Sequence, residues 1–222
     1  MLSILIPVYN YNICPLVKEL HRQCLESEIE FEIICQDDGS NSELNIYNQK
    51  ISTLSNCFFN IYSINIGRGK NINSLARKAK YNCLLILDCD TFPVQNHFIK
   101  NYIDIISDSV KKIFFGGIIY ENKKPPKEQY LRWMYGQKRE TKSTLTSNLL
   151  ITKEIFLQYP FDEAIIKYGY EDLCFFSVLK SNNFEVFRIE NPTYHLNLET
   201  SIVFLNKTKI ALENLKLLYN SN

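Results

Sequence analysis

The sequence predicts an α/β protein with a mostly parallel central sheet. Short apolar runs alternate with segments whose apolar residues recur at helical spacing, which is typical of sheets built from parallel strands. The runs are also continuously apolar, as in Leu84-Leu85-Ile86-Leu87. Parallel strands show this pattern because helices cover both faces of their sheet.

The first half of the chain gives the clearest pattern. A strand is expected at 2–6, where Pro7 closes an apolar run. A helix is expected at 15–25, because Leu16, Val17 and Leu20 follow helical spacing. The next expected elements are a strand at 31–35, a helix at 42–54, a strand at 58–64, a helix at 71–80 and a strand at 84–87.

The second half is less regular. Its expected elements are a strand at 113–120 broken at Gly116-Gly117, a strand at 148–151, a helix at 170–179, a strand at 185–189 and a helix at 201–219. There is no repeat or low-complexity linker, so we expect one domain over residues 1–222. Its function is expected to divide near Phe92, into halves 1–92 and 93–222. The charges of the last helix are mixed and few, which favours packing on the core over contact with a membrane.

Composition narrows the class of protein. Hydrophobic residues make up 45% and charged residues 22% of the 222 residues, a balance that argues against disorder. The net charge of +1 gives no sign of a nucleic-acid binder, which usually carries a strongly basic face. An anionic substrate would therefore be bound by a local site or a metal ion.

The seven cysteines and the lengths of the apolar runs indicate the cellular compartment of the protein. The cysteine count is odd and no pair has CxxC spacing, so we expect reduced thiols in a cytoplasmic protein. Met1 leads directly into the first strand, which predicts that there is no signal peptide. The longest apolar runs are far below the roughly 20 residues of a membrane span. Peripheral contact with the inner membrane stays open.

Polar clusters follow three of the expected strands. They are Pro7-Val8-Tyr9-Asn10, Asp37-Asp38-Gly39-Ser40 and Asp88-Cys89-Asp90. In sheets of this kind, ligands bind beyond the carboxyl ends of the strands. The three clusters are therefore expected to meet at one edge of the sheet and to form a binding site.

Asp88 and Asp90 are candidates for metal binding. Alternate residues of an extended strand point to the same side, so both carboxylates can face one ligand. Two like charges at this spacing are costly unless a cation joins them, and Mg²⁺ and Mn²⁺ prefer oxygen ligands. The alternative is a solvated turn after a strand.

Other polar residues have two interpretations each. Asp37 and Asp38 can accept hydrogen bonds from ribose or base, or they can form an Asx-type turn. Glu171 and Asp172 can supply a general base, or they can stabilise a helix N-terminus. His195 can be a metal ligand for Mn²⁺ or an ordinary surface or core histidine.

Arg68 lies with Lys70 in a glycine-containing turn before a helix. Such a turn can bind phosphate at the helix N-terminus, or it can be a solvated basic turn. The spacing is neither GxGxxG nor a Walker A loop, which argues against dinucleotide and P-loop sites.

Taken together, these clusters resemble family 2 glycosyltransferases with the GT-A fold. The residues that carry the resemblance are the three clusters above, Gly169-Tyr170-Glu171-Asp172 and His195. Within the family the chain looks most like bacterial enzymes that build surface polysaccharide or lipopolysaccharide. That subgroup is supported by Leu131-Arg132-Trp133-Met134-Tyr135-Gly136, Arg139-Glu140 and Phe204-Leu205-Asn206-Lys207-Thr208.

The resemblance implies roles for individual residues. A nucleotide-sugar donor would be bound by Pro7, Tyr9, Asn10, Asp37, Asp38, Arg68, Asn73 and Asp88. Asp90 and His195 would hold Mn²⁺ or Mg²⁺. Asp172 would be the catalytic base, and Glu171 would position the acceptor or donor sugar. One departure is Asn71, where relatives often carry arginine, and Arg68 and Arg77 are the nearby arginines that could compensate.

The resemblance also implies the reaction. A sugar, most simply from a UDP-sugar, would pass to an acceptor hydroxyl of a growing glycan or lipid-linked glycan, with inversion and with help from the metal. The second half would bind the acceptor. The alternatives are a sugar-binding or scaffold protein that keeps the fold without turnover, and a nucleotidyltransferase. The latter usually needs a basic, glycine-rich loop near the first strand, where this chain has Pro7-Val8-Tyr9-Asn10.

Overall fold

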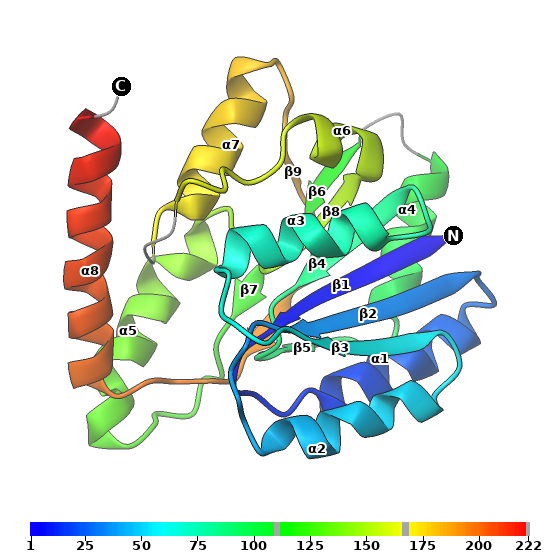
Figure 1. The fold of residues 1–222 in the computed structure, drawn as a ribbon, viewed down its shortest axis with the longest axis horizontal. Helices are drawn as coiled ribbons and strands as arrows, with labels where there is room; N and C mark the ends of the chain where they lie inside the picture. The colour runs from blue at the N-terminus through cyan, green and yellow to red at the C-terminus, as the bar shows by residue number, and fades with distance from the viewer. Residues whose placement is uncertain (109–111, 166–168, 221–222) are drawn as a thin grey trace.

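Two sheets organise the chain in the computed structural model, which describes residues 1–108, 112–165 and 169–220 (Figure 1). The larger sheet has the strand order β3-β2-β1-β4-β8-β6-β9, and the smaller one has the order β5-β10-β7. The first four strands are β1 (Leu2–Val8), β2 (Phe31–Asp37), β3 (Cys57–Ile61) and β4 (Cys83–Leu87). The pairings among these four strands are parallel, which confirms the predicted mostly parallel sheet.

The strand order reverses at β1, which marks the carboxyl ends of β1 and β4 as the expected ligand site. The chain builds outward from β1 to β3 and then returns to add β4 on the other side of β1. Such a reversal is where ligands bind in open α/β sheets. Pairing between β1 and β4 stops at Leu5 and Ile86, whereas β1 stays paired with β2 as far as Val8. Pro7 thus lies inside β1, whereas the sequence predicted that it ends the strand. Proline has no N–H to donate, and it is tolerated here because β1 is no longer paired with β4 at this position.

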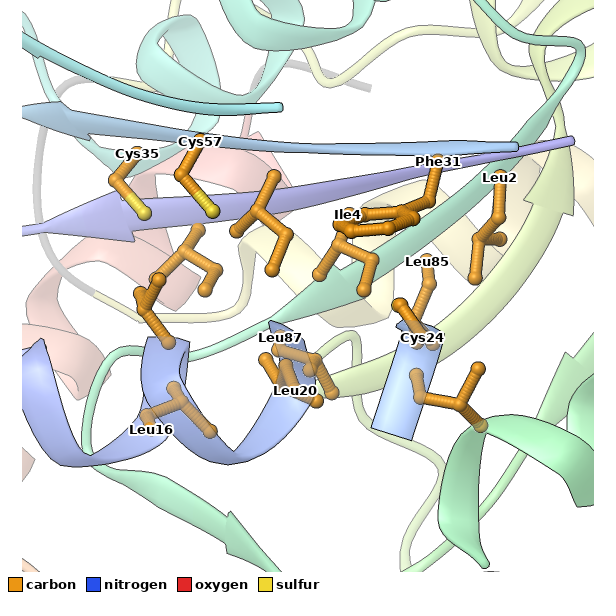
Figure 2. Close-up of a cluster of buried hydrophobic side chains, with 14 of the residues drawn as sticks. Leu2, Ile4, Leu16, Leu20, Cys24, Phe31, Cys35, Cys57, Leu85 and Leu87 are labelled. Carbon is orange, nitrogen blue, oxygen red and sulfur yellow. The ribbon is translucent and has the colours of Figure 1, made fainter. Parts of the chain in front are cut away.

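Helices cover both faces of the larger sheet (Figure 1). One face carries α1 (Cys14–Glu26) and α4 (Phe98–Asp108), and the other carries α3 (Arg68–Lys78), α6 (Lys153–Gln158) and α7 (Glu171–Ser181). Successive side chains of β1 alternate between the two cores: Ile4 and Ile6 face α1, whereas Leu5 faces α3. Figure 2 shows Leu16 and Leu20 of α1 beneath the strands of the first core. Two buried faces explain why the strands are continuously apolar.

The second half of the chain completes the sheet with strands that run both ways. β8 (Asn148–Thr152) is antiparallel to β4 and to β6 (Ile113–Phe115), and β9 (Phe187–Arg188) is parallel to β6. Leu87 at the end of β4 pairs with Asn148 at the start of β8. The residues just before β8 therefore lie at the same edge as the cluster after β4.

The glycine pair at 116–117 separates two strands that belong to different sheets. β6 lies in the larger sheet and β7 (Ile118–Ile119) in the smaller one. A Cβ at Gly116 would lie 2.3 Å from Tyr102 Oη, and Gly117 has a φ of +90°. In the smaller sheet, β10 (Thr193–His195) pairs with β5 (Thr91–Pro93), and His195 stands opposite Thr91. This pairing places His195 next to the cluster after β4.

Other elements differ from the predictions in their bounds. The expected helix at 42–54 is α2 (Leu44–Asn48) followed by the 3-10 helix η1 (Gln49–Thr53). β2 continues through Asp37 and β3 ends at Ile61, and α3 begins at Arg68, three residues earlier than predicted. Several elements were not predicted: α4, α6, β5, β10, η2 (Lys127–Gln129), α5 (Tyr130–Lys138) and η3 (Glu140–Lys142).

The last helix, α8 (Ser201–Asn220), stands beside α5 at one end of the molecule (Figure 1). Among the described helices, none has the length and apolar character needed to cross a membrane. All seven cysteines have free thiols, as the odd count and the spacing predicted. Burial raises the pKa of the Cys57 thiol to about 12 and also raises that of Cys35, which fits residues of an inert core.

Candidate active site

A cluster centred on Arg68 joins two of the predicted carboxylates. Arg68 Nη2 donates to Asp88 Oδ1 at 2.5 Å and to Thr146 Oγ1 at 3.0 Å, and Nη1 donates to Asp172 Oδ1 at 3.3 Å. Asp172 also accepts hydrogen bonds from Thr146 Oγ1 at 2.5 Å and from Thr146 N at 3.2 Å. We call Arg68, Asp88, Thr146 and Asp172 the Arg68 cluster. Burial would lower the pKa of Arg68, but Asp88 and Asp172 outweigh this effect and raise it.

The turn that carries Arg68 is held by the acidic cluster after β2. Asp38 accepts hydrogen bonds from Ile66 N at 2.8 Å and Gly67 N at 3.0 Å, one at each carboxylate oxygen. Gly67 has a φ of +91°, which favours glycine, and Arg68 is the first residue of α3. Burial raises the pKa of Asp38, the two backbone N–H groups lower it and Asp37 adds to the increase.

Asp37 is fully buried beside this turn. Its carboxylate accepts hydrogen bonds from Ser40 N at 2.9 Å and Ser40 Oγ at 2.6 Å, which is the Asx-type turn considered above. Both acidic residues therefore shape the edge of the site.

Asp90 and His195 form a second pair at the same edge. Asp90 Oδ2 lies 3.5 Å from His195 Nε2, and both side chains are largely buried. Burial raises the pKa of Asp90, and Asp88 adds to this, while His195 and Arg132 lower it. His195 Nδ1 is buried without a hydrogen-bond partner in the described chain. We call these two residues the Asp90–His195 pair.

The Asp90–His195 pair offers one oxygen and one nitrogen ligand to a divalent cation. A buried carboxylate 3.5 Å from His195 Nε2 offers an oxygen and a nitrogen that fit Mn²⁺ or Mg²⁺, which keep other positions for phosphate oxygens and water. Asp88 is instead bonded to Arg68. Within the described ranges, no three histidine, cysteine or acidic side chains form a group that could hold a metal ion by themselves.

The predicted site residues at the carboxyl end of β1 differ in how far their side chains are exposed. Pro7 is buried in the strand, whereas the side chain of Tyr9 is 57% exposed and that of Asn10 is exposed. Asn10 has a φ of 48°, so the chain turns sharply there. Tyr9 and Asn10 are therefore accessible to a ligand.

Asn73 lies apart from the other predicted site residues. Its side chain is 1% exposed, donates to Phe161 O at 2.9 Å and accepts from Phe161 N at 3.0 Å. Asn71 is likewise buried and bonded to Gln36. These contacts favour a structural role for both asparagines over contact with a ligand.

Glu171 and Asp172 follow a turn in which two residues have positive φ angles. Gly169 and Tyr170 have φ angles of +102° and +70°, and the Gly169 N–H donates to Glu171 Oε2 at 3.0 Å. A Cβ at Gly169 would lie 2.5 Å from Ala211 Cβ of α8. Asn214 of α8 also donates to Gly169 O at 2.7 Å. The C-terminal helix thus helps to fix the turn that carries both acidic residues.

Sequence reasoning missed two parts of this region. Thr146 belongs to the polar run just before β8, and the direction of β8 would have been needed to bring it to the site. Arg132 is 6% exposed, donates to Glu140 Oε2 at 3.1 Å and lies over the rings of Tyr120 and Phe204. In the sequence, Arg132, Glu140 and Phe204 were noted only as part of the resemblance to the family, and no contact among them was predicted.

Two solved structures illustrate the likeness in fold. TarS of S. aureus (residues 1–349), in complex with UDP-GlcNAc, has a TM-score of 0.68 and 18% identity over 89% of this chain and 59% of that chain. The mannosyltransferase PcManGT from Pyrobaculum calidifontis, in complex with GDP-Man and Mn²⁺, has a TM-score of 0.62 and 13% identity over 87% of this chain and 56% of that chain. This chain thus spans less than two thirds of these proteins. No match is found among curated proteins.

A family model gives the assignment directly. Residues 3–171, which contain the three polar clusters and reach Glu171, match the model of glycosyl transferase family 2. The structural matches show the same fold independently of that model. The chain therefore belongs to glycosyl transferase family 2.

Proposed function

We propose that the chain transfers a sugar from a nucleoside-diphosphate sugar, most simply a UDP-sugar, to an acceptor hydroxyl of a growing surface glycan, with inversion. The observation that carries the proposal is the meeting of the Arg68 cluster and the Asp90–His195 pair at the carboxyl ends of β1 and β4. Solved neighbours bound to UDP-GlcNAc and GDP-Man support this class of donor.

Asp172 is the base in this proposal. The backbone N–H and hydroxyl of Thr146 orient its carboxylate, and proton transfer from the attacking hydroxyl then contributes about 10²- to 10⁴-fold to the rate. Arg68 lies against the same carboxylate and against Asp88. An incoming diphosphate offers Arg68 another anionic partner, so donor binding would leave Asp172 free to accept the proton. Glu171 positions a sugar from the adjacent turn.

Asp90 and His195 would hold the divalent cation, Mn²⁺ or Mg²⁺. When bound, the cation offsets the charge that develops on the leaving nucleoside diphosphate. Burial raises the pKa of Asp90, which supports a cation as an additional partner for this carboxylate. The Mn²⁺ named with one structural neighbour supports the choice of metal.

The nucleotide is assigned to the carboxyl ends of β1 and β2. Tyr9 offers an exposed aromatic ring for the base, and Asn10 offers an amide beside it. Asp37 and Asp38 hold the turn that carries Arg68, and their remaining acceptor capacity faces the ribose in this proposal. We assign donor binding to residues 1–92 and acceptor binding to residues 93–222, with the acceptor a glycan or a lipid-linked glycan.

The test is release of nucleoside diphosphate from a panel of UDP-, GDP-, CDP- and dTDP-sugars, each with Mn²⁺ and with EDTA. Slow hydrolysis of one donor class, dependent on the metal and stimulated by the acceptor, is the expected result. Binding of a donor without release under any condition would instead favour a sugar-binding scaffold protein.

A further inference from the structure

A pocket of about 290 Å³ is lined in part by His195 of the Asp90–His195 pair, and none of its lining residues comes from β1. His195 contributes to its wall, together with Leu196 and Leu198 of the segment that follows β10. The opposite wall comes from residues 120–133, which lie in the second half of the chain. Gln129 joins the two walls by donating to Leu198 O at 2.7 Å. The pocket is therefore built from two segments that hydrogen bonds hold together.

The wall from residues 120–133 presents an aromatic surface. Trp133 is fixed by a hydrogen bond of 2.8 Å from its Nε1 to Glu121 O, and its ring lies 5.7 Å from that of Tyr130. Tyr120 also lines the pocket, and its ring lies 5.3 Å from the His195 ring. Rigid aromatic rings provide large contact area at a low entropic cost. Their faces suit the apolar C–H face of a pyranose ring.

The same wall carries two lysines. Lys123 and Lys124 line the pocket, and neither forms an ion pair within the part of the chain that the structure describes. Lys124 Nζ lies 4.5 Å above the Tyr130 ring, so one ammonium group stands next to the aromatic surface. Glu121 is the one carboxylate among the pocket residues, which leaves a positive balance.

We propose that this pocket binds the acceptor through a sugar ring that stacks on Trp133 and carries an anionic group, a carboxylate or a phosphate, near Lys123 and Lys124. The inference rests on the proposed function, because it takes the pocket's position beside Asp90 as the acceptor side of the reaction. His195 then separates the cation from the bound acceptor and contributes to both sites.

Trp133 is the only tryptophan in the chain, so its fluorescence reports occupancy of this pocket without donor, metal or turnover. The intact protein is titrated with galactose, galacturonic acid and galactose 6-phosphate, up to about 100 mM, because single sugars bind in the millimolar range or above. Both acids are expected to change the emission, with affinities about three- to fivefold above that of galactose. Tighter binding of galacturonic acid would indicate a carboxylate on the acceptor, and tighter binding of galactose 6-phosphate would indicate a phosphate.

Matched variants test the lysines. The double variant Lys123→Gln/Lys124→Gln should bind both acids no more tightly than galactose, while the control Lys50→Gln/Lys100→Gln, on exposed residues elsewhere, should keep the preference. Both variants should retain thermal stabilisation by nucleoside diphosphate and Mn²⁺, which shows that they are folded.

Three results would overturn the proposal: no emission change with any sugar, equal affinity for galactose and both acids, or displacement of the bound acids by UDP and Mn²⁺. The last result would place the pocket on the donor side. Failure of the proposed function would appear separately, as absence of nucleoside diphosphate release from every donor.

Discussion

Asp88 and Asp90 are two residues apart and have opposite surroundings. Asp88 accepts a 2.5 Å hydrogen bond from Arg68, which also reaches Thr146 and Asp172. Asp90 lies 3.5 Å from His195, and burial raises its pKa although His195 and Arg132 lower it. Among the described residues, Asp88 is thus ion-paired with an arginine, whereas Asp90 is paired with a histidine.

This difference explains how a short acidic motif can serve two purposes. A carboxylate paired with arginine is oriented, and here it fixes the guanidinium that lies against Asp172. A buried carboxylate without such a partner is costly, unless a metal ion or a proton compensates it. We infer that Asp88 organises the catalytic groups and that Asp90 binds the cation.

The largest expected effect is that of Asp172→Asn. The amide keeps an oxygen that can accept from Thr146 but cannot take a proton, so transfer should fall by about 10²- to 10⁴-fold while donor affinity is retained. Steady-state kinetics and donor titration by calorimetry measure the two quantities. Transfer at the normal rate would remove Asp172 from the role of base.

Asp90→Asn and Asp88→Asn should have different effects on metal binding. Asp90→Asn should lose metal-dependent donor binding, since a cation–anion contact at 4 Å contributes about 4 kcal/mol at an effective dielectric constant near 20. Asp88→Asn should keep the metal effect and lower transfer by loosening Arg68. Mn²⁺ titrations of both variants, with and without nucleotide, decide the matter. If the two variants lose the metal effect equally, the carboxylates share the cation.

A smaller effect is expected from Thr146→Val. The change keeps the shape of the side chain and the backbone N–H but removes a hydroxyl that donates to Asp172 at 2.5 Å. Hydrogen bonds to charged groups contribute about 1.5–3 kcal/mol, so kcat should fall by roughly 10- to 100-fold with donor affinity unchanged. Thr146→Ser, which restores the hydroxyl, should recover most of the rate. A normal kcat for the valine variant would show that the orientation of Asp172 does not depend on Thr146.

The smallest effect on turnover is expected from Asn73→Ala. Its side chain is bonded to Phe161 in both directions, so the free energy of unfolding should fall by about 1–3 kcal/mol. Donor affinity should stay the same once the variant is folded. Denaturant unfolding and donor titration give the two values. Weaker donor binding without a loss of stability would restore the role that the resemblance gave to Asn73.

The first half of the chain was largely predictable because its signals are local. Three strands of the parallel part, β1, β2 and β4, are buried apolar runs followed by polar residues, and those residues lie at the predicted edge. Some helices and strands begin or end at other residues than predicted, because tertiary contacts fix their ends. One example is α3, which begins at Arg68, three residues before the first residue that the apolar spacing indicates. Burial of both sheet faces explains this success in physical terms.

The second half depends on contacts that no local pattern reveals. β8 brings Thr146 to the site only because it is antiparallel to β4. His195 reaches Asp90 only because β10 pairs with β5 in a separate sheet. The resemblance suggested the roles of Asp172 and His195, whereas the contacts of Asn73 and the position of Arg132 required the structure.

The Asp90–His195 pair is proposed to hold a cation together with a nucleoside diphosphate. The most direct test is a thermal-shift screen of UDP, GDP, CDP and dTDP, each with and without Mn²⁺, on the native chain and on Asp90→Asn. At about 100 times its dissociation constant, a ligand stabilises the folded state by roughly 2.7 kcal/mol. We expect one nucleotide to stabilise the native chain only with Mn²⁺ and to have no metal-dependent effect on the variant. Stabilisation that is independent of Mn²⁺, or equal in both proteins, would contradict the claim.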